Sequence, residues 1–158
     1  MLCNYNLNKY ALAIQSAQKL LALPNITENL IAESHYIIGK SAFALGNKTL
    51  AYSEFAETVK HSFGDKGAES KYHLALINFN DKNYDQAETE CFALANDFGS
   101  SDYWVAKGYI LLADVYTAKA DYFQAKQTLQ SIIDNYEGVD LKQAAQDKLN
   151  AIIAIEGK

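Results

Sequence analysis

The 158-residue sequence contains no arginine, so all fourteen of its basic residues are lysines. Arginine presents a planar fork of donors that can hold a phosphate or carboxylate through two hydrogen bonds, whereas lysine offers a single point charge. The net charge is −5, and acidic residues are interspersed with the lysines. Proteins that bind nucleic acids carry a basic stripe instead. The composition therefore argues against a nucleic-acid partner.

Cysteine, histidine and glycine are too sparse for most catalytic or metal-binding motifs. Cys3 and Cys91 make neither a disulfide framework nor a CxxC metal site. None of the three histidines has a metal-binding spacing such as HExxH, and no glycine-rich loop precedes a helix as phosphate binding requires. We therefore expect a protein that is not an enzyme and that uses no cofactor and no metal.

Long apolar runs are also absent, and proline occurs only at Pro24, so long helices can form without interruption. No apolar run approaches the roughly 20 residues that a membrane span needs. The N-terminus lacks the basic region and the apolar stretch of a signal peptide. Two locations fit these absences: the cytoplasm or, if a leader has been removed, the cell envelope or periplasm.

What the sequence does contain is an internal repeat. Small residues recur at spacings of 38, 36 and 38 residues, at Ala13, Ala51, Ala87 and Ala125. A turn with Asn or Asp precedes each alanine, and the side-chain oxygens of these residues accept the free amide hydrogens of a first helical turn. About twelve residues later the pattern stops, at Pro24, Gly64, Gly99 and Gly138. Each alanine thus marks a helix of about four turns, and we expect the glycines to end these helices in the left-handed conformation.

A second set of small residues lies twelve positions before three of these alanines, at Gly39, Ala75 and Ala113. Small residues at both places let two paired helices approach closely. Bulky or apolar residues follow the alanines by four positions, at Phe55, Cys91 and Leu129. A step of four residues keeps both members on one helical face, so we expect both sets to be buried where helices cross.

This arrangement resembles the tetratricopeptide repeat. Three copies in phase cover nearly the whole chain, although the period exceeds the roughly 34 residues of the family, as in bacterial repeat proteins of the cell envelope. The family's tryptophan position holds His35, Lys71 and Tyr109. The resemblance implies an all-α fold, a right-handed superhelical α-solenoid of about three helix pairs with a half repeat before them and a capping helix after them.

We expect one solenoid domain over residues 1–158. Its parts are a half repeat at 1–26, repeats at about 27–64, 65–99 and 100–138, and a capping helix at 139–158. Leu141, Ala145, Leu149 and Ile152 give that helix one apolar stripe, and polar residues cover its other face. Because the first expected helix, at about 8–23, is the second helix of a repeat, we expect the chain to be the C-terminal part of a longer repeat protein. Its open, apolar N-terminal end then favours association between copies.

The resemblance also implies a binding groove lined by the first helix of each pair. The groove positions hold Tyr36, Lys40, Phe43, Tyr72, Leu76, Phe79, Lys107, Ile110 and Asp114. This mixture of aromatic and charged residues suits a peptide or protein segment. The alternative is that some of these rings pack against a neighbouring repeat. Trp104 has the same two readings, an exposed anchor or a residue packed against the preceding repeat.

Two functions are therefore open. The first is a protein–protein interaction module that holds a peptide or protein in the groove. The second is a structural spacer or self-association segment of a larger envelope-associated solenoid.

Overall fold

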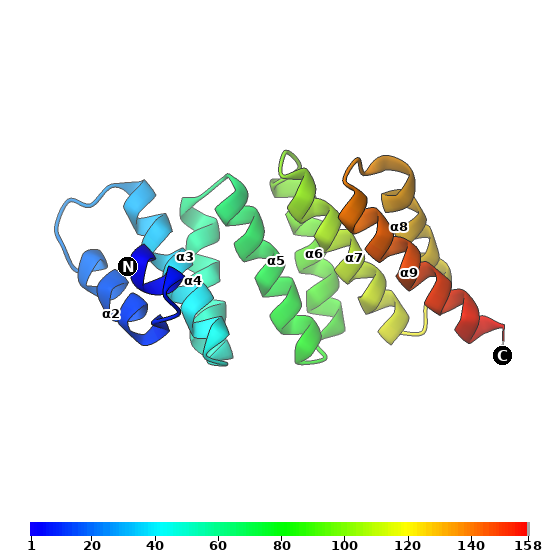
Figure 1. The fold of residues 1–158 in the computed structure, drawn as a ribbon, viewed down its shortest axis with the longest axis horizontal. Helices are drawn as coiled ribbons and strands as arrows, with labels where there is room; N and C mark the ends of the chain where they lie inside the picture. Colours follow the sequence, from blue (N-terminus) through cyan, green and yellow to red (C-terminus); the bar gives the residue numbers. More distant parts are fainter. Residues whose placement is uncertain (158) are drawn as a thin grey trace. The chain divides into compact units, whose positions relative to one another are not determined.

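The computed structural model describes residues 1–157, and every regular element in that range is an α-helix (Figure 1). In chain order the helices are α1 (Leu2–Asn6), α2 (Tyr10–Leu21), α3 (Glu28–Ala44), α4 (Lys48–His61), α5 (Asp65–Asn80), α6 (Tyr84–Asp97), α7 (Asp102–Ala118), α8 (Tyr122–Asn135) and α9 (Val139–Glu156). The predicted all-α fold is confirmed, and the predicted helices agree with α2 to α9 within a few residues. No helix of the described residues is both long and apolar enough to span a membrane.

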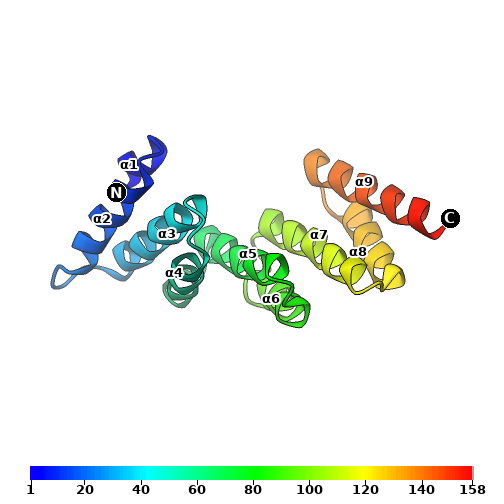
Figure 2. The ribbon, with the colours of Figure 1, turned by 90° about the horizontal axis from the view of Figure 1, so that it is seen from below.

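The helices form two compact units, Met1–Leu74 and Ala75–Lys158, and the boundary between them falls inside α5. In the first unit α3 packs against α4 on one side and α2 on the other, while the short α1 contacts both α2 and α3. In the second unit α7 packs between α6 and α8, and α9 covers α8 and contacts α7. Figure 2 shows α9 beside α8 at the C-terminal end of this unit.

The turn inside each helix pair has the same geometry four times. One residue of the turn has a left-handed backbone, with φ of 57° at Asn8, 75° at Gly46, 64° at Lys82 and 59° at Ala120. The next amide N–H donates to the carbonyl oxygen five residues earlier, at 2.8 to 2.9 Å in all four turns. Because α1 and α2 are joined by this same turn, α1 occupies the place of a first helix.

The short α1 corrects the expectation that the first helix of the N-terminal repeat is missing. Five residues of it are present, although isolated helices of this length have little stability of their own and depend on tertiary packing. The helices end close to the expected glycines, but the left-handed conformation expected of these glycines is wrong. Gly64, Gly99 and Gly138 are not among the residues with positive φ. The chain instead leaves α4 and α8 through extended residues, Ser62 and Tyr136, so a left-handed glycine is not needed there.

The small residues of the repeat lie where it predicts them. Ala51, Ala87 and Ala125 are fully buried, as are Phe55 and Leu129. A Cβ atom added to Gly39 would lie 2.9 Å from Cδ1 of Phe55, so the two helices of this pair meet at van der Waals distance. In α9 the four predicted apolar residues Leu141, Ala145, Leu149 and Ile152 are buried. The repeat register is therefore confirmed at its buried positions.

Side-chain caps begin three of these helices. Thr27, Asn47 and Asp121 each accept a hydrogen bond from the backbone amide three residues later. Asn83 occupies the N-cap position of α6 without such a bond, and Lys9 rather than Asn8 is the N-cap residue of α2. Asn and Asp therefore indicate in the sequence where these helices begin, although their side chains do not cap every one of them.

Candidate functional site

All nine predicted groove residues are partly exposed. Tyr36, Lys40, Phe43 and Tyr72 belong to the first unit, and Leu76, Phe79, Lys107, Ile110 and Asp114 belong to the second. All of them lie on α3, α5 or α7, which are the first helices of the three full pairs. Their chemical surroundings differ, as the contacts within each unit show.

In the first unit, Glu69 of α5 holds two of the predicted residues of α3. The hydroxyl of Tyr36 donates to Oε2 of Glu69 at 2.5 Å, and the Nζ of Lys40 donates to Oε1 at 2.7 Å. Lys40 also donates to the Tyr36 hydroxyl oxygen at 3.2 Å. These three side chains therefore form a closed network between two first helices.

Two aromatic rings surround the same ammonium group. The Nζ of Lys40 lies 5.2 Å from the ring centroid of Tyr36 and 5.6 Å from that of Tyr5 on α1. A cation over a ring face is attracted by the ring quadrupole. Lys40 is therefore neutralised and enclosed by its own chain, and its charge is not freely available to a partner.

The pKa values of the network follow from these contacts. Burial alone would raise the pKa of Glu69, but the proximity of His73 and the hydrogen bonds from Lys40 and Tyr36 outweigh it and lower that pKa to about 2. Burial, followed by the hydrogen bond to Glu69, raises the pKa of Tyr36. For Lys40 burial acts downward, and the ion pair with Glu69 more than compensates, so its pKa is raised. Glu69 is thus ionised, and Tyr36 and Lys40 are protonated, at neutral pH.

The other two predicted residues of the first unit surround His73. The ring of His73 stacks on the buried Phe55 at 4.7 Å, and Phe43 tilts against it at 4.8 Å. Tyr72 meets the same imidazole edge-on at 5.7 Å. Phe43 therefore contributes to packing between helices as well as to the surface, as the alternative interpretation of the groove rings proposes.

The remaining histidines join α3 to α4. His35 pairs with Glu54 at 2.6 Å, and His61 pairs with Glu28 at 2.7 Å. Their two rings stack with centroids 6.3 Å apart. Within the part of the chain that the structure describes, no three His, Cys, Asp or Glu side chains come together in a way that could hold a metal ion.

In the second unit the predicted groove residues are less connected to one another. Asp114 on α7 accepts a hydrogen bond from the Nζ of Lys148 on α9 at 2.6 Å. Lys107 lies over the ring of Trp104, at 4.8 Å, and over that of Tyr103, at 5.5 Å. Trp104 is half-buried and meets Tyr103 edge-on, so it belongs to an aromatic cluster at the start of α7.

Ile110 packs against the buried cluster that α7, α8 and α9 share. Phe79 contacts the ring of Tyr84 on α6 at 5.8 Å. Leu76 is half-buried on α5. These three apolar residues therefore have at least partly structural roles.

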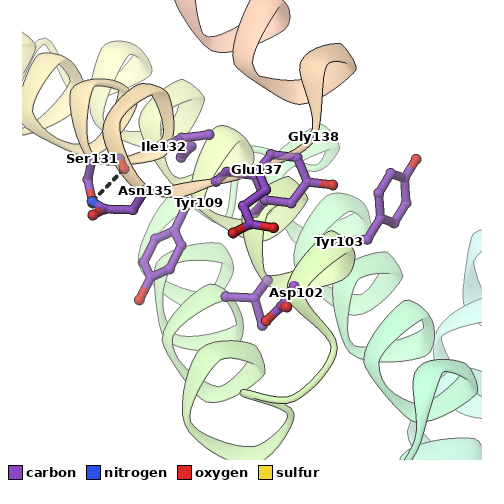
Figure 3. Close-up of a pocket in the computed structure, with 11 residues that line it drawn as sticks. Asp102, Tyr103, Tyr109, Ser131, Ile132, Asn135, Glu137 and Gly138 are labelled. Carbon is purple, nitrogen blue, oxygen red and sulfur yellow. Dashed lines mark hydrogen bonds between the residues drawn. The ribbon is translucent and has the colours of Figure 1, made fainter.

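A cavity of about 590 Å³ opens in the second unit, between α7 and the connection from α8 to α9 (Figure 3). Its lining consists of Asp102, Tyr103, Val105, Ala106, Tyr109, Ser131, Ile132, Asn135, Tyr136, Glu137 and Gly138. We call it the α7–α9 pocket. None of the nine predicted groove residues lines it. A smaller cavity of about 310 Å³ lies between α7 and α8, and Tyr109 and Ser131 border both.

Sequence analysis missed the α7–α9 pocket because part of its lining lies in the connection after α8, which has no helical period. In the sequence, residues Tyr136, Glu137 and Gly138 indicate only the end of a helix. In the structure Gly138 has a packing role, since an added Cβ would lie 2.4 Å from Cε1 of Tyr136. Three aromatic residues within two turns of α7, Tyr103, Trp104 and Tyr109, and a fourth ring after α8, Tyr136, are the signal that could have revealed it.

Comparisons with known proteins agree with the fold. Residues 109–138 match the family model described as tetratricopeptide repeat. Residues 109–138 therefore hold a tetratricopeptide repeat, and the chain has the helical-repeat fold that the spacing of its small residues predicts. Its structure is similar to the crystal structure of MamA, with a TM-score of 0.65 and 21% sequence identity over 98% of this chain and 92% of that chain. No curated protein matches the sequence.

Proposed function

We propose that the chain is a non-catalytic protein–protein interaction module that binds a peptide or protein segment on the face formed by its first helices. The tetratricopeptide-repeat fold generally serves as a scaffold for protein interactions. The observation that supports this face is the network of Tyr36, Lys40 and Glu69. It holds polar and aromatic side chains in fixed positions, yet leaves them partly exposed.

Fixed side chains favour binding because they lose little conformational freedom when a partner arrives. The rings of Tyr36 and Tyr72 offer the contact area that binding hot spots typically use. The ion pair between Lys40 and Glu69 carries no net charge, so charge tunes the choice of partner more than it sets the affinity. In the second unit the ion pair between Asp114 and Lys148 has the same consequence.

The test begins with peptides selected from a random library on the wild-type protein. In the double variant Tyr36→Ala, Tyr72→Ala the affinity for a selected peptide should fall about tenfold or more, since one hot-spot residue contributes about 1–2 kcal/mol. The matched control replaces Tyr52 on α4 and the exposed Phe63 after it by alanine, because both lie outside the first helices.

Circular dichroism and the melting temperature check that each variant is folded. A double variant that folds normally and binds the selected peptides as tightly as the wild type would move the function away from this face. Tyr36→Phe keeps the ring and loses only the hydroxyl, with its hydrogen bonds to Glu69 and Lys40, so it separates contact area from the network.

The second candidate function is self-association or spacing through the N-terminal end. Four leucines of this end are about half exposed: Leu2 (49%), Leu7 (58%), Leu12 (49%) and Leu23 (55%). Apolar residues gathered at one end of a repeat array favour contact with another copy. Sedimentation equilibrium should then show a concentration-dependent dimer that Leu7→Lys and Leu12→Lys weaken. A strict monomer at millimolar concentration would exclude this candidate.

A further inference from the structure

We propose that the α7–α9 pocket binds a basic side chain, the ammonium of lysine or the guanidinium of arginine, presented by a peptide segment. The proposal does not rest on the face of the first helices, because none of the residues proposed to bind there lines this pocket. Its basis is the combination of a cavity, three tyrosines and two carboxylates within one unit.

The aromatic residues are Tyr103 and Tyr109 on α7 and Tyr136 after α8. A cation within about 6 Å of a tyrosine face is attracted by the ring, and the attraction grows when water is displaced. The same segment of α7 already shows this chemistry, because Lys107 lies 5.5 Å from the ring centroid of Tyr103. Because Lys107 already lies over the Tyr103 ring, Tyr109 and Tyr136 are the main aromatic partners for an incoming cation.

The charge in the pocket has one sign. Asp102 and Glu137 line it, and no lysine or histidine is found among its described lining residues. In Figure 3 both carboxylate side chains lie in the middle of the pocket, between Tyr109 on one side and Tyr103 on the other. A negatively charged, ring-lined cavity is complementary to a cation with an apolar stem. An acidic ligand would be repelled by these carboxylates, and a purely apolar ligand would gain nothing from them.

Tyr136 is the third tyrosine of the pocket, and its hydroxyl has a raised pKa. Desolvation, followed by the negative charge of Asp140 and the neighbouring Tyr103 and Asp102, raises the pKa of its hydroxyl. The tyrosine therefore stays neutral and keeps a ring face that attracts cations. Its ring packs against the buried cluster of the unit, and Gly138 leaves room for it because it has no Cβ.

The size of the pocket suits a side chain with its flanking backbone. Its 590 Å³ lies within the range of about 300–1,000 Å³ that is typical of ligand pockets. The bottom of the pocket is rigid, because Ala106 and Ile132 are buried core residues of the unit. Ser131 and Asn135 on one wall are joined by a hydrogen bond of 2.8 Å from Nδ2 of Asn135 to the Ser131 carbonyl oxygen.

The probe is Nα-acetyl-lysine methylamide, and Nα-acetyl-norleucine methylamide is its neutral partner of nearly equal shape. A ligand of this size binds with a dissociation constant on the order of 1 mM, so chemical-shift changes of backbone amides are the appropriate readout. We expect the lysine compound to shift amides of α7 and of residues 136–138, with at least about fivefold higher affinity than the norleucine compound. The arginine analogue should bind at the same amides.

The variant Asp102→Asn, Glu137→Gln should bind the lysine compound about three- to tenfold more weakly and the norleucine compound equally well. The matched control, Asp134→Asn, Asp147→Asn, changes the net charge by the same amount at exposed residues outside the pocket, so it should bind like the wild type. If the double variant does not fold, Glu137→Gln alone, in an exposed connection, should weaken binding about twofold or more.

Three results would overturn the proposal. The first is equal affinity for the lysine and norleucine compounds, which would make the pocket merely apolar. The second is the absence of shifts near residues 136–138 with 20 mM lysine compound, roughly twenty times the expected dissociation constant, at low salt. The third is a folded carboxamide variant that binds as the wild type does. Because the function proposed above is tested by Tyr36→Ala and Tyr72→Ala, at residues that do not line this pocket, none of these results bears on it.

Discussion

Glu69 is the position at which a single substitution tests the network of the first unit most directly. Its side chain is 14% exposed and accepts hydrogen bonds from both Lys40 and Tyr36. A carboxyl whose pKa falls from 4.5 to about 2 on folding stabilises the folded state by roughly 3 kcal/mol at neutral pH. Glu69→Gln keeps the shape and removes the charge, so it should destabilise the protein by about 2–3 kcal/mol at pH 7.

The pH dependence provides a sharper measurement. Because the pKa of Glu69 is lower in the folded protein, its contribution is complete well above pH 4.5 and is lost as the pH falls towards 2. With a pKa of 4.5 in the unfolded chain and about 2 in the folded protein, about 2 kcal/mol of the stabilisation by Glu69 should be lost between pH 7 and pH 3. Urea denaturation of the wild type and of Glu69→Gln at both pH values should therefore show the gap between them closing by about that amount.

The control is Glu57→Gln, the same chemical change at a largely solvent-exposed ion pair with Lys60. It should stay close to the wild type at both pH values, because exposed pairs contribute little. If the gap between the wild type and Glu69→Gln were the same at pH 7 and pH 3, the carboxylate would not stabilise the fold through its charge. The conclusion that the ionised Glu69 stabilises this network would then be wrong.

Three further predictions concern packing and reactivity. Ala87→Leu should destabilise the protein by about 1–3 kcal/mol in urea denaturation, because the side chain is fully buried at a helix crossing, and an unchanged stability would refute the repeat register. Gly138→Ala should displace the ring of Tyr136, whose Cε1 would lie 2.4 Å from the new Cβ, and aromatic proton shifts that match the wild type would contradict this. In the folded protein Cys91 should resist Ellman's reagent while the exposed Cys3 reacts. The reason is that burial, with nearby acidic residues, raises the pKa of Cys91 to about 12. Two thiols that react equally fast would contradict this prediction.

The sequence predicts the helix pairs well because close packing restricts which residues can stand where they cross. At Gly39 nothing larger fits beside Phe55, and Ala51 and Ala125 are fully buried. Such restrictions recur at a fixed spacing and are therefore visible in one sequence. The short α1 carries no comparable signal, because five residues are too few for a helical period to show.

The surface is predicted less completely than the core. Positions on a first helix follow from the repeat, so Tyr36 and Lys40 are found on neighbouring turns of α3 as expected. Their partner Glu69, and the ring of Tyr5, depend on how separate helices meet, which spacing does not reveal. The charge of Lys40 is neutralised by Glu69 through the same contact. The α7–α9 pocket is harder still to predict from the sequence, since Tyr136 lies in a connection that has no periodic pattern.

The left-handed turns inside the helix pairs have a consequence for how much mutation the fold can tolerate. Glycine adopts this backbone conformation freely and occupies it at Gly46, whereas Lys82 and Ala120 adopt it at a cost of roughly 1–2 kcal/mol each. Helix packing on both sides must offset that cost. Glycine at these two positions should then add a modest reserve of stability, after allowing for the greater freedom of the unfolded chain. With this added stability, the protein would tolerate destabilising substitutions on its exposed faces that the natural sequence tolerates poorly.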